Sequence, residues 1–103
     1  MLTSLKMINL LLDQLLGRLV NTGSKKELKS FLKTVLTPKE LVQIPKRLEI
    51  LKQLLKGFKQ RDISKNLKVS LCTVTRGSNI LKLLEDIDER RQPDWWKNFK
   101  KMN

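Results

Sequence analysis

The side chains best suited to chemistry lie between residues 60 and 82, where hydroxyl and amide groups are interspersed with cations. Groups of this kind hydrogen-bond to the base edges and phosphates of nucleic acids. The chain has no histidine and a single cysteine, Cys72. It therefore lacks the usual general base, any histidine-based catalytic triad and a cysteine metal cage. We expect no catalytic residue and no metal site, and thus a protein that is not an enzyme.

The charge of the chain points to an anionic partner. Lys and Arg number 22 against 10 Asp and Glu, which is a formal net charge of +12 over 103 residues. Residues 41–82 hold ten of the basic groups but only two acidic ones, Glu49 and Asp62. Such an excess is typical of proteins that bind nucleic acid or an anionic membrane surface. The plainer alternative is that the lysines only keep the surface soluble.

Residues 60–79 have the apolar spacing of a helix-turn-helix. Counted from Gln60, positions four, eight, ten and fifteen are Ile63, Leu67, Val69 and Val74. Ser64 is small where the second helix would pass over the first, and Ser70 can cap that second helix. Lys68 stands where the turn usually has glycine, and a left-handed lysine costs about 1 kcal/mol. Two packed helices with a basic surface remain the alternative.

The apolar N-terminal stretch predicts an amphipathic helix. Polar residues at 9, 13 and 14 interrupt this stretch, so we expect neither a signal peptide nor a membrane span. We accordingly expect the protein to be cytoplasmic. Apolar residues recur at steps of four and three, at Leu5, Ile8, Leu12, Leu15 and Leu19. Leu11 and Leu16 widen this stripe beyond what one small neighbour covers. The width favours a homodimer over an ordinary core helix of a monomer.

Local signals also place two further helices. Ser24 and Glu27 have the spacing of a capping box, which opens a helix through about residue 35. Residues 37–40 repeat this device more strongly with a Thr, a Pro and a Glu, and open the next helix. Pro45 should kink this third helix or shift its start, and Gly57 suits its C-terminal end. No strand pattern is present, so the fold class is all-α.

Three segments carry a resemblance to a known family. Thr73-Val74-Thr75-Arg76-Gly77-Ser78-Asn79, followed by Leu81-Lys82, resembles the recognition helix of the Trp repressor family. Leu36 to Glu40 and Leu48 to Gly57 resemble the entry and the body of that family's third helix. The resemblance implies six helices in an intertwined homodimer, one helix-turn-helix per subunit, and transcriptional repression with L-tryptophan as corepressor.

The domain organisation expected from this is a single helical domain over residues 1–103. Residues 1–35 would be dimerisation helices, and residues 83–103 a C-terminal helix. Residues 36–82 would hold the ligand-pocket helix and the DNA-binding core.

The resemblance also implies a set of ligand-binding residues for a tryptophan-like molecule. They are Thr37, Arg47, Arg76, Gly77 and Ile80. Two arginines can stack on an indole ring and pair with a carboxylate. Ile80 stands where the family has a Ser that meets the amino group, and Pro45 where it has a Gly. We therefore expect weaker tryptophan binding than in relatives, or a preference for an indole carboxylic acid without the amino group.

The residues implied to contact a double-stranded DNA operator lie on both helices of the motif. They are Gln60, Arg61, Leu71, Cys72, Thr73, Thr75, Ser78, Asn79 and Lys82. Ser64 replaces a Lys of the family, so one phosphate contact is missing. Cys72 is either a redox-sensitive contact or, as we favour, a small apolar residue near a thymine methyl group.

Two alternatives stay open. Trp95 and Trp96 are either an aromatic anchor for a partner or, as we favour, residues that pack on the dimer body. The whole chain could instead be a basic helical adaptor that binds protein or RNA without reading a DNA sequence.

Overall fold

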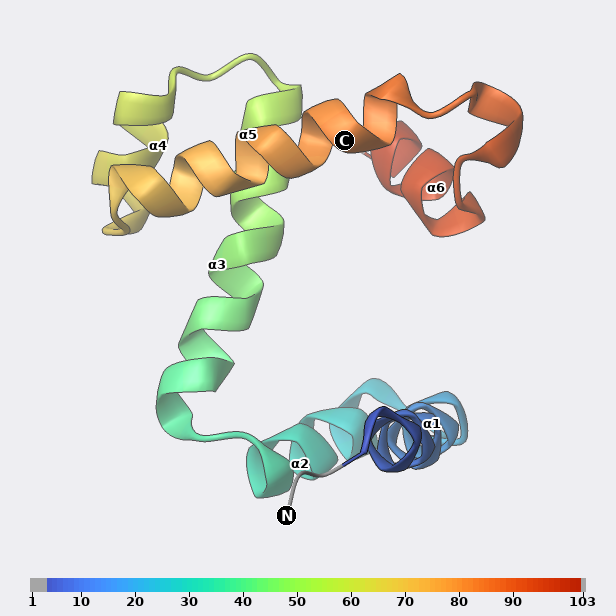
Figure 1. Ribbon diagram of the computed structural model, residues 1–103. Coiled ribbons are helices and arrows are strands. Elements are labelled where there is room, and N and C mark those ends of the chain that lie inside the picture. Colours follow the sequence, from blue (N-terminus) through green and yellow to red (C-terminus); the bar gives the residue numbers. More distant parts are fainter. Residues whose placement is uncertain (1–3, 103) are drawn as a thin grey trace. The chain divides into compact units, whose positions relative to one another are not determined.

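The computed structural model describes residues 4–102, which form helices joined by short turns (Figure 1). The elements are α1 (Leu5–Val20), α2 (Lys25–Val35), α3 (Pro38–Leu55), α4 (Gln60–Leu67), α5 (Leu71–Asp86), the short 3-10 helix η1 (Glu89–Arg91) and α6 (Asp94–Met102). Within residues 4–102 there are six α-helices and no strand, so the predicted all-α class is confirmed. None of the described helices is long and apolar enough to cross a membrane. The chain divides into two compact units, Met1–Leu41 and Val42–Asn103, which we describe separately.

The N-terminal unit contains α1, α2 and the first residues of α3. The Ser4 hydroxyl accepts a hydrogen bond from the Met7 amide at 3.1 Å and caps α1. The Ser24 hydroxyl accepts from the Glu27 amide at 3.1 Å, and the Glu27 carboxylate accepts from the Gly23 amide at 2.9 Å. The predicted cap of α2 is therefore present. Neither α1 nor α2 has a buried residue.

The start of α3 is a reciprocal cap. The Thr37 amide donates to the Glu40 carboxylate at 2.9 Å, and the Glu40 amide donates to the Thr37 hydroxyl at 3.1 Å. These hydrogen bonds, chiefly the one from the Thr37 backbone, hold the pKa of Glu40 below its ordinary value. The helix begins at Pro38 and continues through Pro45, so the start is not shifted by that proline.

The end of α3 is closed by a left-handed glycine. Gly57 has φ 85°, its amide donates to the Leu54 carbonyl at 3.0 Å, and the Phe58 amide donates to the Gln53 carbonyl at 3.1 Å. This is the Schellman arrangement, in which glycine avoids the Cβ clash of a positive φ. The predicted role of Gly57 is confirmed.

The core of the C-terminal unit joins α3 to both helices of the motif. Ile50 of α3, Ile63 of α4 and Val74 of α5 are each at most 1% exposed. Leu54, Leu67 and Val69 pack around them. The four predicted crossing positions thus lie in one cluster, and the helix-turn-helix is built as the spacing indicated. Lys68 joins the helices with φ 55° and ψ 50°, the left-handed conformation expected of it.

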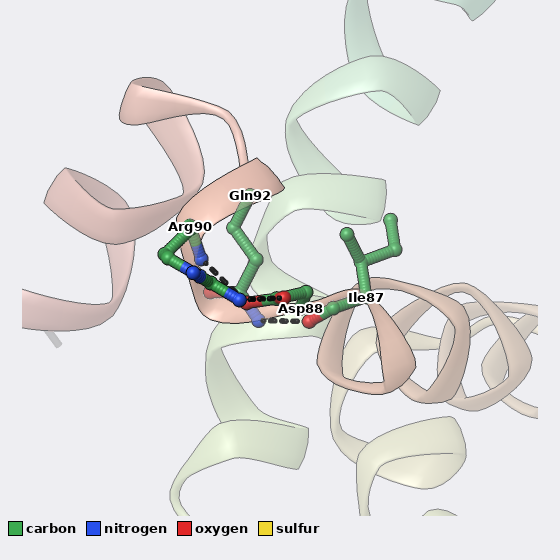
Figure 2. A network of polar contacts seen from close by, with 4 residues as sticks. All are labelled: Ile87, Asp88, Arg90 and Gln92. Carbon is green, nitrogen blue, oxygen red and sulfur yellow. Dashed lines mark hydrogen bonds and ion pairs between the residues drawn. The ribbon is translucent and has the colours of Figure 1, made fainter.

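The segment after α5 folds back over the end of that helix. The buried Gln92 donates its side-chain amide to the carbonyls of Leu84 at 3.1 Å and Ile87 at 3.2 Å. Figure 2 shows this corner, where Arg90 also pairs with Asp88 at 3.1 Å. Hydrogen bonds from Arg90, first from its side chain, hold the pKa of Asp88 below its ordinary value.

The two tryptophans of α6 differ in burial. Trp96 is fully buried, stacks on Phe99 with ring centres 5.9 Å apart, and has the Lys100 ammonium 5.5 Å from its ring centre. Trp95 is 56% exposed. Trp96 is therefore a packing residue within its own unit.

Candidate functional site

The exposed face of α5 carries most of the predicted DNA contacts. With 3.6 residues per turn, residues 71, 75, 78, 79 and 82 fall on one side of this helix, with 72 beside them. Five of these six side chains are exposed and the other, Ser78, is half-buried. The helix begins at Ser70, whose hydroxyl accepts from the Thr73 amide at 3.2 Å. This end of α5 therefore presents its side chains on a capped first turn.

The first turn of α4 adds to the same surface. The Thr75 hydroxyl donates to the Gln60 side-chain carbonyl at 2.9 Å, which joins the two helices across fifteen residues of sequence. Arg61 follows Gln60 and is exposed. The structure thus brings together Gln60 and Thr75, and leaves Arg61 free to reach an anion.

The opposite side of α5 forms a cavity with α3. Arg47, Ile50 and Leu51 of α3 and Thr73, Arg76, Gly77 and Ile80 of α5 line a volume of about 210 Å³. Four of the five residues predicted to bind the ligand lie here: Arg47, Arg76, Gly77 and Ile80. Thr73, predicted to contact DNA, also lines this cavity and is half-buried.

Gly77 lets α5 approach α3 closely. A Cβ atom at this position would stand 2.9 Å from Cγ2 of Ile50, a separation that side chains do not tolerate. Because Ile50 is buried on its other sides, it has little room to move. Glycine therefore sets the width of the cavity, which was not evident from the sequence.

Two guanidinium groups and three aliphatic side chains decide what this first cavity can hold. Ile50, Leu51 and Ile80 offer apolar surface, and Arg47 and Arg76 offer planar cations. An aromatic ring gains from both, and a carboxylate on the ring's substituent can pair with a guanidinium. Among the described residues the one ion pair is Arg90 with Asp88, so neither arginine is neutralised by a neighbouring acid.

A second cavity of about 300 Å³ adjoins the first and was missed by the sequence reasoning. It shares Arg47, Ile50 and Thr73 with the first. The remaining lining residues are Gln43, Lys46, Lys68, Val69 and Ser70. Its cations come from α3 and from the turn before α5. These two segments are far apart in the sequence, so no single motif could have placed them in one cavity.

Thr37 belongs to the N-terminal unit, where its hydroxyl accepts the Glu40 amide. Its predicted contact with a ligand stays a prediction.

This arrangement defines a helical protein with a helix-turn-helix, an exposed face on α5 and a cavity of about 210 Å³ on the opposite side of that helix. Residues 11–90 match the family described as Trp repressor protein. A Trp operon repressor homolog of Vibrio vulnificus is 38% identical over 80 residues, which cover 77% of this chain and 78% of the relative. Homologs from Mannheimia succiniciproducens and Actinobacillus succinogenes are each 48% identical, over 62% and 53% of this chain and 61% and 55% of their own lengths.

No solved structure matches the chain. The family match alone spans most of the sequence, and the chain belongs to the Trp repressor family. It is a transcriptional repressor and not an enzyme.

Proposed function

We propose that this protein represses transcription by binding a specific DNA operator as a homodimer, under the control of L-tryptophan or a related indole ligand. The observation that carries the proposal is the division of α5 into two faces. One face is exposed and polar, and the other closes a cavity with two arginines. A ligand in that cavity would touch the helix that touches DNA, so the two binding events would be coupled.

The DNA part of the proposal rests on charge and side-chain type. Thr75, Asn79 and Lys82 stand on the exposed face of a helix that the turn at Lys68 holds against α4. Such side chains on a helix entering the major groove can read base edges, while Arg61 can reach a phosphate. The net charge of +12 supplies the attraction to a polyanion.

The ligand part rests on the chemistry of the first cavity. A planar aromatic acid satisfies both its apolar walls and its two guanidinium groups. The relatives are named for the Trp operon, which supports tryptophan or an indole relative as that acid.

The dimer part rests on α1. Leu5, Leu11, Leu12 and Leu16 are between 48% and 76% exposed in the single chain. A helix this apolar needs a partner surface, and a second copy of the same chain is the simplest one.

Selection from a pool of randomised duplexes, with and without L-tryptophan, tests the proposal. We expect enrichment of a two-fold symmetric sequence that requires tryptophan. Arg61→Ala and Thr75→Ala should then each weaken binding to the selected duplex by about tenfold to a hundredfold, with the fold unchanged. Lys101→Ala, at the exposed end of α6, serves as the control. Duplexes with no common sequence, or an affinity independent of salt, would instead support the basic adaptor.

A further inference from the structure

We propose that the second cavity, lined by Lys46, Arg47 and Lys68, binds a phosphate group of the DNA backbone. The proposal rests on the proposed DNA-binding function and adds to it a contact outside the recognition face of α5. The chemistry that it requires is recognition of one phosphate by several cations at once.

The composition of the cavity supports a phosphate. Lys46 and Arg47 come from α3 and Lys68 from the turn between α4 and α5, and among the described lining residues none is acidic. Gln43, Ser70 and Thr73 add an amide and two hydroxyl groups as neutral donors. Phosphate oxygens accept charge-assisted hydrogen bonds from such cations, and several donors around one phosphate give a defined site.

The backbone of Lys68 is a second observation. Lys68 has φ 55° and is the only non-glycine residue with positive φ in the described chain. Its amide bonds locally to the Lys65 and Ser64 carbonyls, which any residue could do. Gly or Asn would adopt this conformation at lower cost, and nothing in the fold requires the ammonium group. A strained residue with a charge that the fold does not use indicates a binding role.

The position of the cavity suits the backbone of a bound duplex. Ser70 and Thr73 line it, and Ser70 immediately precedes the exposed residues Leu71 and Cys72. Phosphates run along both edges of a groove, beside the bases that a recognition helix reads. A duplex on the exposed face of α5 therefore brings its backbone to the start of this helix, where Lys68 stands.

Two variants test the proposal without disturbing the ligand cavity. Lys46→Gln and Lys68→Asn each remove one cation, and Asn tolerates the left-handed conformation. Arg47 is not a suitable target because it lines both cavities. Lys101→Gln removes the same charge from the exposed end of α6 and is the matched control. Thermal unfolding should show Lys68→Asn to be at least as stable as the unmodified chain.

The measurement is fluorescence anisotropy of a labelled mixed-sequence duplex, over a series of salt concentrations, with the full chain. A backbone contact is independent of sequence, so no operator is needed. We expect each cavity variant to weaken binding and to lower the slope of log affinity against log salt by about 1 for each bound subunit. Lys101→Gln should change the slope much less.

Three outcomes overturn the proposal in distinguishable ways. If the unmodified chain binds but both cavity variants behave like Lys101→Gln, the phosphate assignment alone is wrong. If the unmodified chain binds no duplex, the DNA-binding function fails with it. If inorganic phosphate shifts the amide resonances of Lys68 and Ser70 while the salt slopes stay unchanged, the cavity holds a free anion and not the DNA backbone.

Discussion

Ile80 is 42% exposed at the edge of the cavity that Arg47 and Arg76 line. Its branched aliphatic side chain has no atom that can accept a hydrogen bond from an ammonium group. The two guanidinium groups repel an ammonium and attract a carboxylate. We therefore expect the cavity to favour an acid that lacks an amino group over a zwitterion of the same shape.

We predict that Ile80→Ser tightens tryptophan binding. An added hydroxyl acceptor is worth about 1–3 kcal/mol to the ammonium of a bound tryptophan, or roughly tenfold to a hundredfold in affinity. Calorimetry with both proteins checks this, with indole-3-propionate as the matched ligand, whose binding should stay equal or weaken. If the unmodified protein already binds tryptophan at low micromolar concentrations and the variant is no better, a backbone carbonyl must hold the ammonium.

Gly77→Ala should destabilise the C-terminal unit. The added Cβ would meet Ile50 Cγ2 at 2.9 Å, and such overpacking costs about 1–3 kcal/mol. Gly17→Ala is the control, since a Cβ there meets nothing within 4 Å and alanine favours a helix. Chemical denaturation should show a lower midpoint for the first variant and an equal or higher one for the second. Equal midpoints for Gly77→Ala and the unmodified chain would mean that α5 can move away from α3.

At the scale of elements, side-chain caps mark where α2, α3 and α5 begin. Ser24, Thr37 and Ser70 each accept a backbone amide of the first turn. Such caps stabilise a helix end because the first amides have no partner inside the helix. The cap of α3 differs from the others in having a carboxylate that accepts the amide of the capping residue itself.

The cap of α3 should weaken in acid. The pKa of Glu40 is lowered from 4.5 in the folded chain. The ionised Glu40 carboxylate therefore contributes fully to the stability of the fold above pH 4.5, and this contribution is lost as the pH falls through the lower folded pKa. We expect the Thr37 amide resonance to titrate with a midpoint below 4.5. Glu40→Gln should abolish this titration, whereas Glu85→Gln on α5 should leave it unchanged. A midpoint at or above 4.5 would contradict the hydrogen bonds of the cap.

For the whole molecule, the exposed apolar surface of α1 is the dominant feature. No residue of α1 is buried in the single chain, and leucines on several sides of the helix are half exposed or more. Burial of apolar surface yields about 25 cal/mol for each Å² removed from water, so leaving this helix uncovered is costly. Small helical chains commonly recover that stability by associating.

Sedimentation equilibrium should show a species of twice the 12.1 kDa chain mass. Leu12→Glu, on the predicted stripe, should shift the equilibrium toward single chains, because a charged residue in an apolar interface loses its hydration. Lys6→Gln on the same helix changes the net charge by the same amount and is the control for a change of charge alone. A single 12.1 kDa species at micromolar concentration would remove the dimer and, with it, the expectation of a symmetric operator.

The helix ends and the crossing residues of the motif follow from the sequence alone. Ser24, Gly57 and Ser70 act through hydrogen bonds or dihedral angles within a few residues, so local spacing is sufficient to identify them. Ile63 and Val74 are buried as their positions in the motif indicated, because two short helices joined by a tight turn have few ways to pack.

The tertiary structure alone decided which further groups line the cavities. It placed Thr73 of α5 in both cavities, brought Lys46 and Lys68 to the lining of one cavity, and showed that Ile50 requires a glycine at position 77. These features depend on side chains from helices far apart in sequence. Their contacts exist only after α3 has packed against α5, and no pattern of neighbouring residues records them.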